Sequence, residues 1–408
     1  MSLPTCHPRT LLRCVVGLLA CLLCACGGGG AGGGSASSGT PAPSASNTLP
    51  IAVQQFAGSQ AATLNIPYVT VTLCDATSRC ADIPNVLLDT GSTGLRLLSS
   101  ALTGTGLNLT TVASGNGVLG ECTYFASGYL WGAIRQATVQ LGQQSTQAGV
   151  SVQVVGDSAV PAGGGSTYCT GSATDLSSQL AANGILGIST FLNDTGSFFR
   201  CSTGSCVATI ATDSTASSIG QKPVNPVAKL PAAYSNGVIV QMPAIAATGA
   251  ATATGTLVLG INSASNNQLA GSANVYALNS QGRLGVSVNG SAGSGFIDSG
   301  SNGYFLSLTG VPQCSPPNMG FYCPASPVAL TLQISSGAVT SASLSAQIGN
   351  ANSLMQSGDL ALPELGGSSA IVGQVDLGLP FFYGRSIAFG MEGTTLNSQN
   401  YSNGFVSF

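Results

Sequence analysis

Two short motifs constrain the fold of this 408-residue chain more than any other feature. In residues 85–95 and again in residues 295–303, apolar residues lead into an aspartate, a small hydroxyl residue and a glycine. The pattern is typical of a buried strand that ends in a tight loop, with Asp89 or Asp298 presented on that loop. A single copy is also an ordinary β-turn sequence. Two copies with matching lead-ins indicate two carboxylates that are needed at one place.

The composition predicts an exported, all-β body with two lobes. Charged residues make up 6% of the chain, and short strand-like runs such as residues 68–73 recur between Gly-rich turns. About 360 residues exceed what one core usually fills. We therefore expect an N-terminal β lobe at 49–238 with the first motif and a C-terminal β lobe at 239–408 with the second. No basic cluster points to nucleic acid, and the formal net charge is −3.

The scarcity of histidine and lysine limits the chemistry. The only histidine is His7, in the expected leader, and the lysines are Lys222 and Lys229, in a segment that we interpret as the lobe connection. Ser-His-Asp and Cys-His centres and histidine-ligated metal sites are therefore excluded from the mature chain. Proton transfer would have to rest on carboxylates, and we expect no cofactor and no metal.

The paired motifs resemble the catalytic loops of the pepsin-like aspartic peptidases. In that family each lobe also carries two apolar residues and a glycine beside its aspartate loop. Residues 185–187 match this signature, and Leu377-Gly378 matches it more loosely, because Asp376 stands where an apolar residue is usual. The resemblance runs from about residue 67 to residue 408. It implies an all-β, bilobal pepsin-like fold with a cleft between the lobes.

The resemblance also implies roles for the motif residues. Asp89 and Asp298 would form a catalytic dyad that activates a water molecule. The neighbouring small residues would support the dyad: hydroxyls would join the two loops or contact a carboxylate, and glycines would let the backbone pass close behind. These supporting residues are Thr90, Gly91, Ser92, Ser299, Gly300 and Ser301.

In the family, a hairpin flap from the first lobe covers the cleft. Residues 132–142 resemble its returning strand, which places residues 124–128 at the tip, and the flap candidates are Tyr124, Phe125 and Gly128. Phe125 stands where the peptidases carry a tyrosine. Tyr124, Tyr129 or Trp131 would supply the missing group, or no residue does, and the alternative is that these aromatics are hydrophobic core. Arg96 is a second departure, at a position where tryptophan is usual.

The N-terminus has the pattern of a bacterial lipoprotein. Residues 1–25 carry basic residues and then an apolar core, which predicts a signal peptide. Cys26 would be the lipidated first residue of the mature chain, and an ordinary signal peptide cut slightly later is the alternative. Gly27 resembles the sorting signal for the outer membrane of Gram-negative bacteria. Residues 26–48, rich in Gly, Ser and Ala, would be a flexible tether that holds the body at the cell envelope, facing the periplasm or the exterior.

The cysteines predict disulfides in an oxidising compartment. Eight cysteines follow Cys26, and an even number in an exported chain is typical of four bridges. A zinc site is the alternative, but no Cys-x-x-Cys occurs after the leader. The most economical of the many possible pairings is Cys74–Cys80, Cys122–Cys169, Cys201–Cys206 and Cys314–Cys323.

Two function classes follow, with a third in reserve. The first is an envelope-anchored aspartic endopeptidase that hydrolyses polypeptides. The second is a pepsin-fold lipoprotein that binds a peptide or protein partner without cleaving it, and the altered flap favours it. A β-rich adhesin, in which both motifs are turns, would require the long-range resemblance to be accidental.

Overall fold

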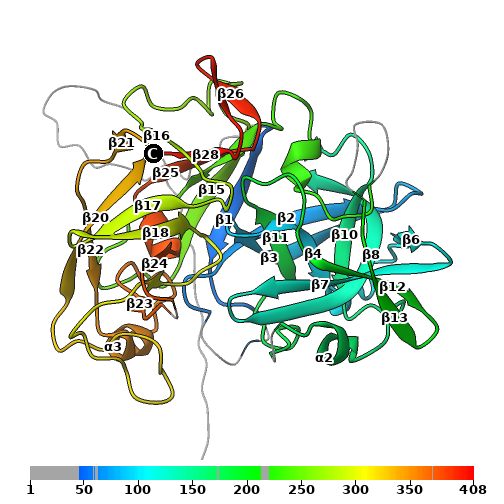
Figure 1. The fold of residues 1–408 in the computed structure, drawn as a ribbon, viewed down its shortest axis with the longest axis horizontal. Helices are drawn as coiled ribbons and strands as arrows, with labels where there is room; N and C mark the ends of the chain where they lie inside the picture. The colour runs from blue at the N-terminus through cyan, green and yellow to red at the C-terminus, as the bar shows by residue number, and fades with distance from the viewer. Residues whose placement is uncertain (1–45, 58, 60–62, 172–173, 213–219, 370) are drawn as a thin grey trace, which may run out of the picture. The chain divides into compact units, whose positions relative to one another are not determined.

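Strands from distant parts of the chain pair side by side in the computed structural model, which describes residues 46–57, 59, 63–171, 174–212, 220–369 and 371–408 (Figure 1). Strand β1 (Thr48–Val53) pairs along its whole length with β15 (Ala253–Leu259) and, at its end, with β2 (Pro67–Cys74). Asn47 is buried and donates from Nδ2 to the carbonyl of Leu259 (3.0 Å). Asn47 and Thr48, the last residues of the expected tether, are therefore part of the folded body.

The first lobe consists mostly of antiparallel strands, with two short helices. Besides β2, its elements are β3 (Cys80–Asp89), β4 (Thr93–Leu98), α1 (Ser99–Leu102), β5 (Thr110–Thr111), β6 (Ala113–Ser114), β7 (Gly117–Phe125), β8 (Gly128–Leu141), β9 (Gln144–Ser145), β10 (Val150–Val155), α2 (Gly164–Tyr168), β11 (Gly184–Ile188), β12 (Ser197–Ser202) and β13 (Ser205–Thr209). The 3₁₀ helix η1 (Pro226–Lys229) follows in the expected lobe connection.

The second lobe contributes one set of strands to the sheet that contains β1 and another set to a sheet of its own. The first set is β14 (Gly237–Gln241), β15, β16 (Val275–Ala277), β25 (Ser386–Gly390) and β28 (Phe405–Ser407). The second set is β17 (Leu284–Val288), β18 (Ser291–Ile297), β19 (Tyr304–Phe305), β20 (Val328–Ser336), β21 (Val339–Thr340), β22 (Leu344–Ile348), β23 (Gly366–Gly367) and β24 (Gln374–Leu377). The remaining elements are α3 (Ala351–Gln356), η2 (Leu379–Phe382), β26 (Thr394–Leu396) and β27 (Gln399–Tyr401).

This architecture confirms the predicted all-β, bilobal fold. In each lobe, one short strand lies between a parallel and an antiparallel neighbour. Every residue of β11 is buried, because β11 lies between parallel β3 and antiparallel β4. In the second lobe, β24 lies between parallel β18 and antiparallel β19 in the same way. Within the described part of the chain, no helix is long and apolar enough to cross a membrane.

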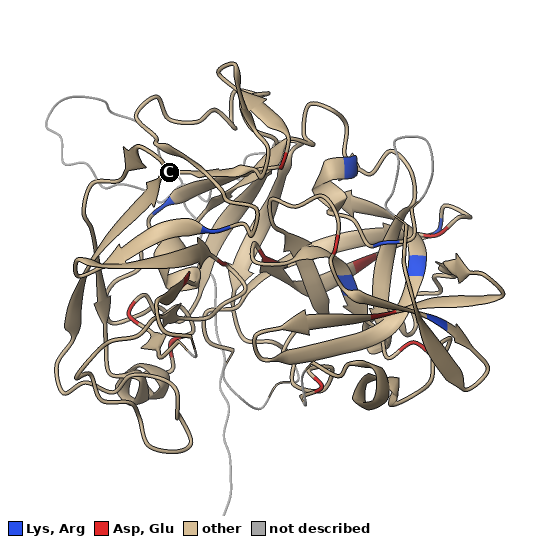
Figure 2. Ribbon diagram, viewed as in Figure 1, with Lys and Arg blue, Asp and Glu red and all other residues tan. Residues whose placement is uncertain are grey.

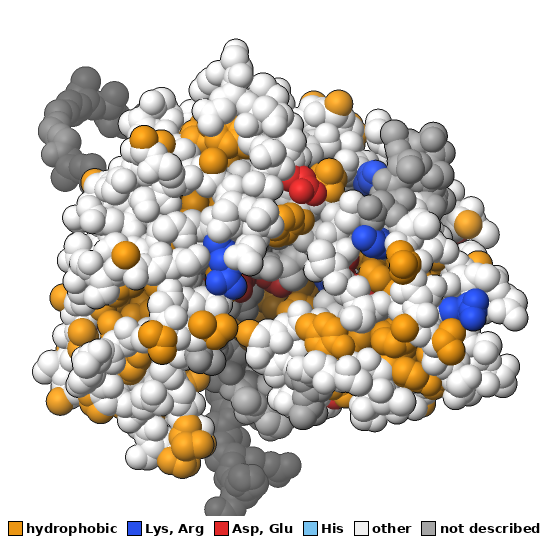
Figure 3. Space-filling view, viewed as in Figure 1, with side chains coloured by type: hydrophobic (Ala, Val, Ile, Leu, Met, Phe, Trp, Pro, Cys, Tyr) orange, Lys and Arg blue, Asp and Glu red, His pale blue; other side chains and the backbone are white. Residues whose placement is uncertain are grey.

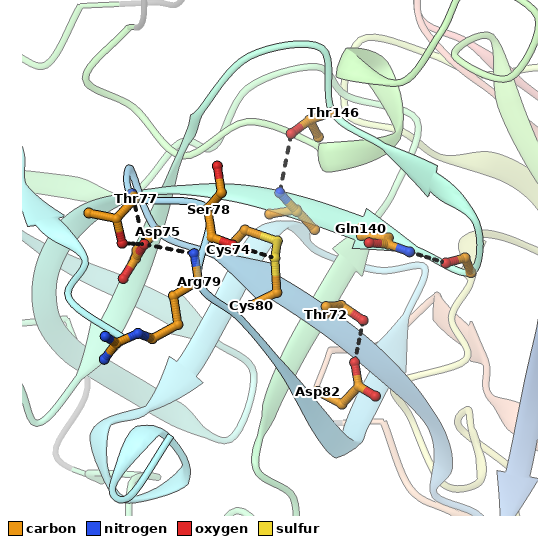
Figure 4. The surroundings of a disulfide bond; sticks show 12 residues. Thr72, Cys74, Asp75, Thr77, Ser78, Arg79, Cys80, Asp82, Gln140 and Thr146 are labelled. Atoms are coloured by element: carbon orange, nitrogen blue, oxygen red, sulfur yellow. Dashed lines mark hydrogen bonds between the residues drawn. A yellow bond between two sulfur atoms is a disulfide. The ribbon is translucent and has the colours of Figure 1, made fainter. Parts of the chain in front are cut away.

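The structure contains the four predicted disulfides. Figure 4 shows Cys74–Cys80, which closes the β2–β3 hairpin. In that turn, Asp75 accepts hydrogen bonds from the amides of Thr77 (2.9 Å) and Arg79 (3.1 Å). The Cys122–Cys169 bridge spans 47 residues and joins β7 to the end of α2. It therefore ties the flap hairpin to a segment far along the chain.

We expect protein from an oxidising compartment to have no free thiol among these eight cysteines. Loss of a native disulfide costs about 2–5 kcal/mol, and the entropic model predicts a larger cost for a longer loop. Replacing Cys122 and Cys169 together by serine should therefore lower the free energy of unfolding more than the same change at Cys201 and Cys206. Thiol titration of the unfolded, unreduced protein checks the pairing, and two or more reactive thiols would contradict it.

Candidate active site

The two aspartate loops lie at the ends of the central strands. Asp89 is the last residue of β3, and Asp298 directly follows β18. The apolar-Gly signatures run alongside, with Gly187 of β11 paired with Asp89. In the second lobe, the amide of Asp298 donates to the carbonyl of Leu377 (3.0 Å). Each signature therefore supports the aspartate loop of its own lobe, as the resemblance implied.

Hydroxyl groups join the two loops across the lobes. The Thr90 hydroxyl donates to the carbonyl of Ile297 (3.1 Å) and accepts from the amide of Ser299 (2.9 Å). The Ser299 hydroxyl donates to the carbonyl of Leu88 (2.7 Å) and accepts from the amide of Thr90 (3.1 Å). Ser299 is fully buried and Thr90 is 5% exposed. Four reciprocal hydrogen bonds thus hold the loops in one position relative to each other.

Each glycine of the motifs faces the aspartate of the opposite lobe. A Cβ atom on Gly91 would lie 2.6 Å from Cγ of Asp298, and one on Gly300 would lie 2.6 Å from Oδ1 of Asp89. Any side chain here would overlap a carboxylate, so both positions require glycine. This mutual approach places the two carboxyl groups beside each other.

The donors to the two carboxylates are arranged alike. Each Oδ1 accepts the amide hydrogen of the glycine two residues further on, at 2.8 Å in both loops. Each Oδ2 accepts the hydroxyl of the serine three residues further on, from Ser92 to Asp89 and from Ser301 to Asp298 (2.9 Å). The six residues predicted to support the dyad therefore all make contacts within the two aspartate loops.

The electrostatics of the pair favour retention of a proton. Burial raises the pKa of Asp298 well above its usual range, and the negative charges of Asp89 and Asp376 raise it further, whereas the amide of Gly300 lowers it. Neighbouring carboxylates in such a site titrate as a unit. The pair can therefore hold one ionised and one protonated carboxyl group at the same time, which is the state that acid–base chemistry requires.

The predicted flap is a hairpin of β7 and β8, in which Phe125 pairs with Gly128. Its aromatic residues differ in environment. Tyr129 and Trp131 are buried in a cluster with Tyr168 and Phe199, so these two are hydrophobic core. This outcome corrects the alternative in which either one supplies the missing tyrosine.

The two candidates nearest the turn contact other groups of the first lobe. Tyr124 is 38% exposed, and its ring lies next to Gly171. The ring of Phe125 faces the guanidinium of Arg96, 5.8 Å from its centroid. Gly128 lies close to the carbonyl of Thr174, where a Cβ atom would be at 2.4 Å.

Arg96 is a buried anchor between the first aspartate loop and the flap. Its side chain is 1% exposed and pairs with Asp194. The guanidinium also donates to the hydroxyl of Thr123 on β7 (3.1 Å) and to the carbonyl of Thr93 (2.8 Å). Burial and the charge of Asp194 raise the pKa of neighbouring Glu121 well above its usual range, which Arg96 opposes. A polar network thus occupies the site where the family has a tryptophan.

A cavity of about 250 Å³ lies beside the dyad, and Thr90, Gly91, Phe296 and Arg283 are among its lining residues. Charged residues are sparse along the ribbon of both lobes (Figure 2). Figure 3 shows acidic side chains at the bottom of a hollow, with a basic side chain at its rim. A second hollow, of about 620 Å³ around residues 158–162, has no titratable group among its lining residues.

Two contacts of the site could not be predicted from the sequence. Asp376 accepts a hydrogen bond from Ser301 (2.6 Å), and Arg96 pairs with Asp194. Both involve charged residues inside apolar segments of a chain that has few charges. That mismatch was the available signal, but it did not indicate which partner each residue would meet.

A sequence profile described as "Protein of unknown function (DUF3443)" matches residues 43–408. The chain belongs to the DUF3443 family. A search of curated proteins found no match to this DUF3443 chain.

Among solved structures, an aspartic proteinase from Irpex lacteus is similar to this DUF3443 protein, with a TM-score of 0.51 and 13% sequence identity. The match covers 88% of the DUF3443 chain and 96% of the proteinase. At this identity the comparison establishes the pepsin-like fold. It also shows that the expected fold extends over nearly the whole body.

Proposed function

We propose that this protein is an envelope-anchored aspartic endopeptidase that hydrolyses polypeptides with Asp89 and Asp298. One observation carries the proposal: both carboxylates have the same set of donors and face each other across hydrogen-bonded loops. A β-turn has no need for such an arrangement. The adhesin alternative therefore has little support from the site.

The chemistry follows from a shared proton. Two adjacent carboxyl groups in a partly desolvated cleft hold one proton between them. The ionised member takes a proton from water as the water oxygen attacks the scissile carbonyl, while the protonated member donates a hydrogen bond to the carbonyl oxygen. The C–N bond of the resulting tetrahedral intermediate then breaks, and the proton taken from water passes to the leaving nitrogen. The raised pKa of Asp298 favours retention of that proton. The loop hydrogen bonds keep both groups oriented, so little reorganisation is needed during the reaction.

The second candidate is a pepsin-fold protein that binds a peptide without cleaving it. The flap supports this alternative, because Phe125 faces Arg96 and Tyr124 lies against Gly171. Both rings therefore pack against groups of the first lobe. A binder would retain the cleft and lose the contribution of the flap to orienting the scissile bond.

Incubation of the purified body, residues 46–408, with an unstructured protein at several pH values from acidic to mildly alkaline distinguishes the two candidates. The peptidase should release fragments whose formation is blocked by a statine-type inhibitor, which mimics the tetrahedral transition state. The binder should give no fragments at any pH while retaining affinity for peptides. Cleavage that is insensitive to the inhibitor but sensitive to serine-protease reagents would indicate contamination and would not support the dyad.

We also propose that the protein is lipid-anchored through Cys26 at the bacterial envelope, with the outer membrane as the site of anchoring. The basis is the sequence pattern, since Cys26 lies outside the described residues. The four disulfides are compatible with an extracytoplasmic location. A tether before β1 would hold the cleft away from the lipid surface.

Replacing Cys26 by serine should abolish incorporation of labelled fatty acid and release the protein from the membrane fraction. Stable attachment needs more than one acyl chain, because a single chain binds only marginally. Metabolic labelling and membrane fractionation measure the two effects. As a control, replacing Cys24 by alanine should leave labelling intact. Membrane association that persists without label in the Cys26 variant would contradict the anchor.

A further inference from the structure

Asp376 lies beside the loop that carries Asp298. On β24, Asp376 pairs with Phe296 of the parallel strand β18. Its side chain reaches Ser301, whose Oγ atom lies 2.6 Å from Oδ2 of Asp376 and 2.9 Å from Oδ2 of Asp298. A single hydroxyl group therefore stands between two carboxyl groups.

Counting hydrogens shows that one of these two carboxyl groups carries a proton. A serine hydroxyl has one hydrogen to donate. Both contacts of Ser301 can be hydrogen bonds only if one of the two carboxyl groups is protonated and donates to Oγ. Oδ1 of Asp376 is also buried, with no hydrogen-bond partner among the described residues. Burying an ionised carboxylate with one oxygen unpaired is costly, which favours a proton on Asp376.

The first lobe provides an internal comparison. Ile185 occupies the position equivalent to that of Asp376, one residue before the Leu-Gly pair of β11. Ile185 is 3% exposed and apolar. Accordingly, within the described structure, Ser92 donates to Asp89 and meets no second carboxylate. The third carboxyl group is therefore a feature of the Asp298 side alone.

Few other charges act on Asp376. The flanking strands β18 and β19 carry no Lys, Arg, Asp or Glu, and their one ionisable side chain is Tyr304, whose pKa burial raises to about 12. The charge of Asp89 disfavours ionisation of Asp376. Arg283 lies over the ring of Phe296, 5.8 Å from its centroid, and forms no ion pair with Asp376 in the described structure.

We propose that Asp376 is a third carboxylate of this site, linked to Asp298 by Ser301, and that its negative charge keeps the dyad proton in place to higher pH than two aspartates alone would. Asp376 is a positioning residue, since it acts through Ser301 and Asp298. The predicted effect on peptide hydrolysis rests on the proposed function. It predicts a peptidase that stays active closer to neutral pH.

The causes that shift the pKa of Asp376 agree with this proposal. Burial raises the pKa of Asp376 to about 7, the Ser301 hydroxyl lowers it, and the charge of Asp89 raises it. Asp376 then ionises as the pH approaches neutrality. Its new charge opposes the loss of the proton from Asp298, because a neighbouring like charge raises the pKa of a carboxyl group.

The test compares the pH dependence of kcat/KM in the unchanged protein, Asp376→Asn and Asp376→Leu. Both substitutions remove the charge, so the alkaline limb of the profile should move to lower pH by about one unit. Asp82→Asn, at an exposed carboxylate of the first lobe, is the matched control and should leave the limb in place. An alkaline limb that does not move, or that moves to higher pH in the Asp376 variants, would overturn the proposal.

A second measurement does not depend on hydrolysis. In the folded protein Asp376 keeps its proton to about pH 7. In the unfolded chain the same carboxyl group releases its proton at about pH 4. The unchanged protein should therefore lose stability relative to Asp376→Asn between about pH 4 and about pH 7, and their urea midpoints should diverge across this window. A constant difference between the midpoints would refute the proton on Asp376. Absence of cleavage in the unchanged protein would instead count against the proposed function.

Discussion

Replacing either Asp89 or Asp298 by asparagine is expected to reduce kcat/KM for peptide hydrolysis by roughly 10⁴-fold or more. An asparagine can donate a hydrogen bond but cannot accept the proton of the attacking water. Because the two carboxyl groups act as one unit, the double variant should be hardly less active than either single variant. Cleavage of an unstructured protein, followed by mass spectrometry, measures the loss.

The fold should survive these substitutions. In the Asp298→Asn protein the new amide would carry no charge beside Asp89, and the raised pKa of Asp298 shows that its ionised form is disfavoured in the folded state. The free energy of unfolding at neutral pH should therefore be unchanged or higher. Asp82→Asn should retain full activity, because Asp82 lies away from the dyad and is exposed. Undiminished cleavage by the Asp298→Asn protein would end the dyad assignment.

The peptidase activity proposed for the unchanged protein should also fall at high pH. The acid form of the dyad needs the shared proton, and its loss leaves two ionised carboxylates with no group to donate to the substrate carbonyl. Because the pKa of Asp298 is raised, this loss should begin well above the pH at which an isolated aspartate ionises.

The largest expected effect on stability comes from Arg96. Replacing it by methionine should lower the free energy of unfolding by about 3–5 kcal/mol, because the partner carboxylate of Asp194 would remain buried without its counter-charge. The change also removes the donor to Thr123 on the flap strand. Urea unfolding of the oxidised protein at neutral pH measures the loss.

Two further variants test the cause. Arg96→Met combined with Asp194→Asn should be more stable than Arg96→Met alone, because the isolated buried carboxylate is gone. Arg200→Met, at an exposed arginine of β12, should change stability by no more than about 0.5 kcal/mol. A loss below about 1 kcal/mol for Arg96→Met would show that water reaches the cluster and that the pair is not structurally important.

Much of the site could be inferred from local patterns in the chain. The apolar run before Asp89 and the one before Asp298 predicted buried strands. The glycines that follow predicted a close approach of the two loops, and in the structure Gly91 and Gly300 lie against the opposite aspartates. Cysteine spacing predicted the bridges, because three of them join residues at most nine apart in the chain. Such features depend on a few neighbouring residues, so they are visible without a tertiary structure.

Other features depended on which strands pair and which way a side chain points from the pleat. Asp376 departed visibly from the apolar pattern, but only the parallel pairing of β24 with β18 brings it to Ser301. Arg96 meets Asp194, far along the chain, because their two segments fold against the same buried site. Strand period and composition carry no information on contacts between distant residues. The partners of the buried charges were therefore decided by tertiary packing, whereas the aspartate loops were already evident in the sequence.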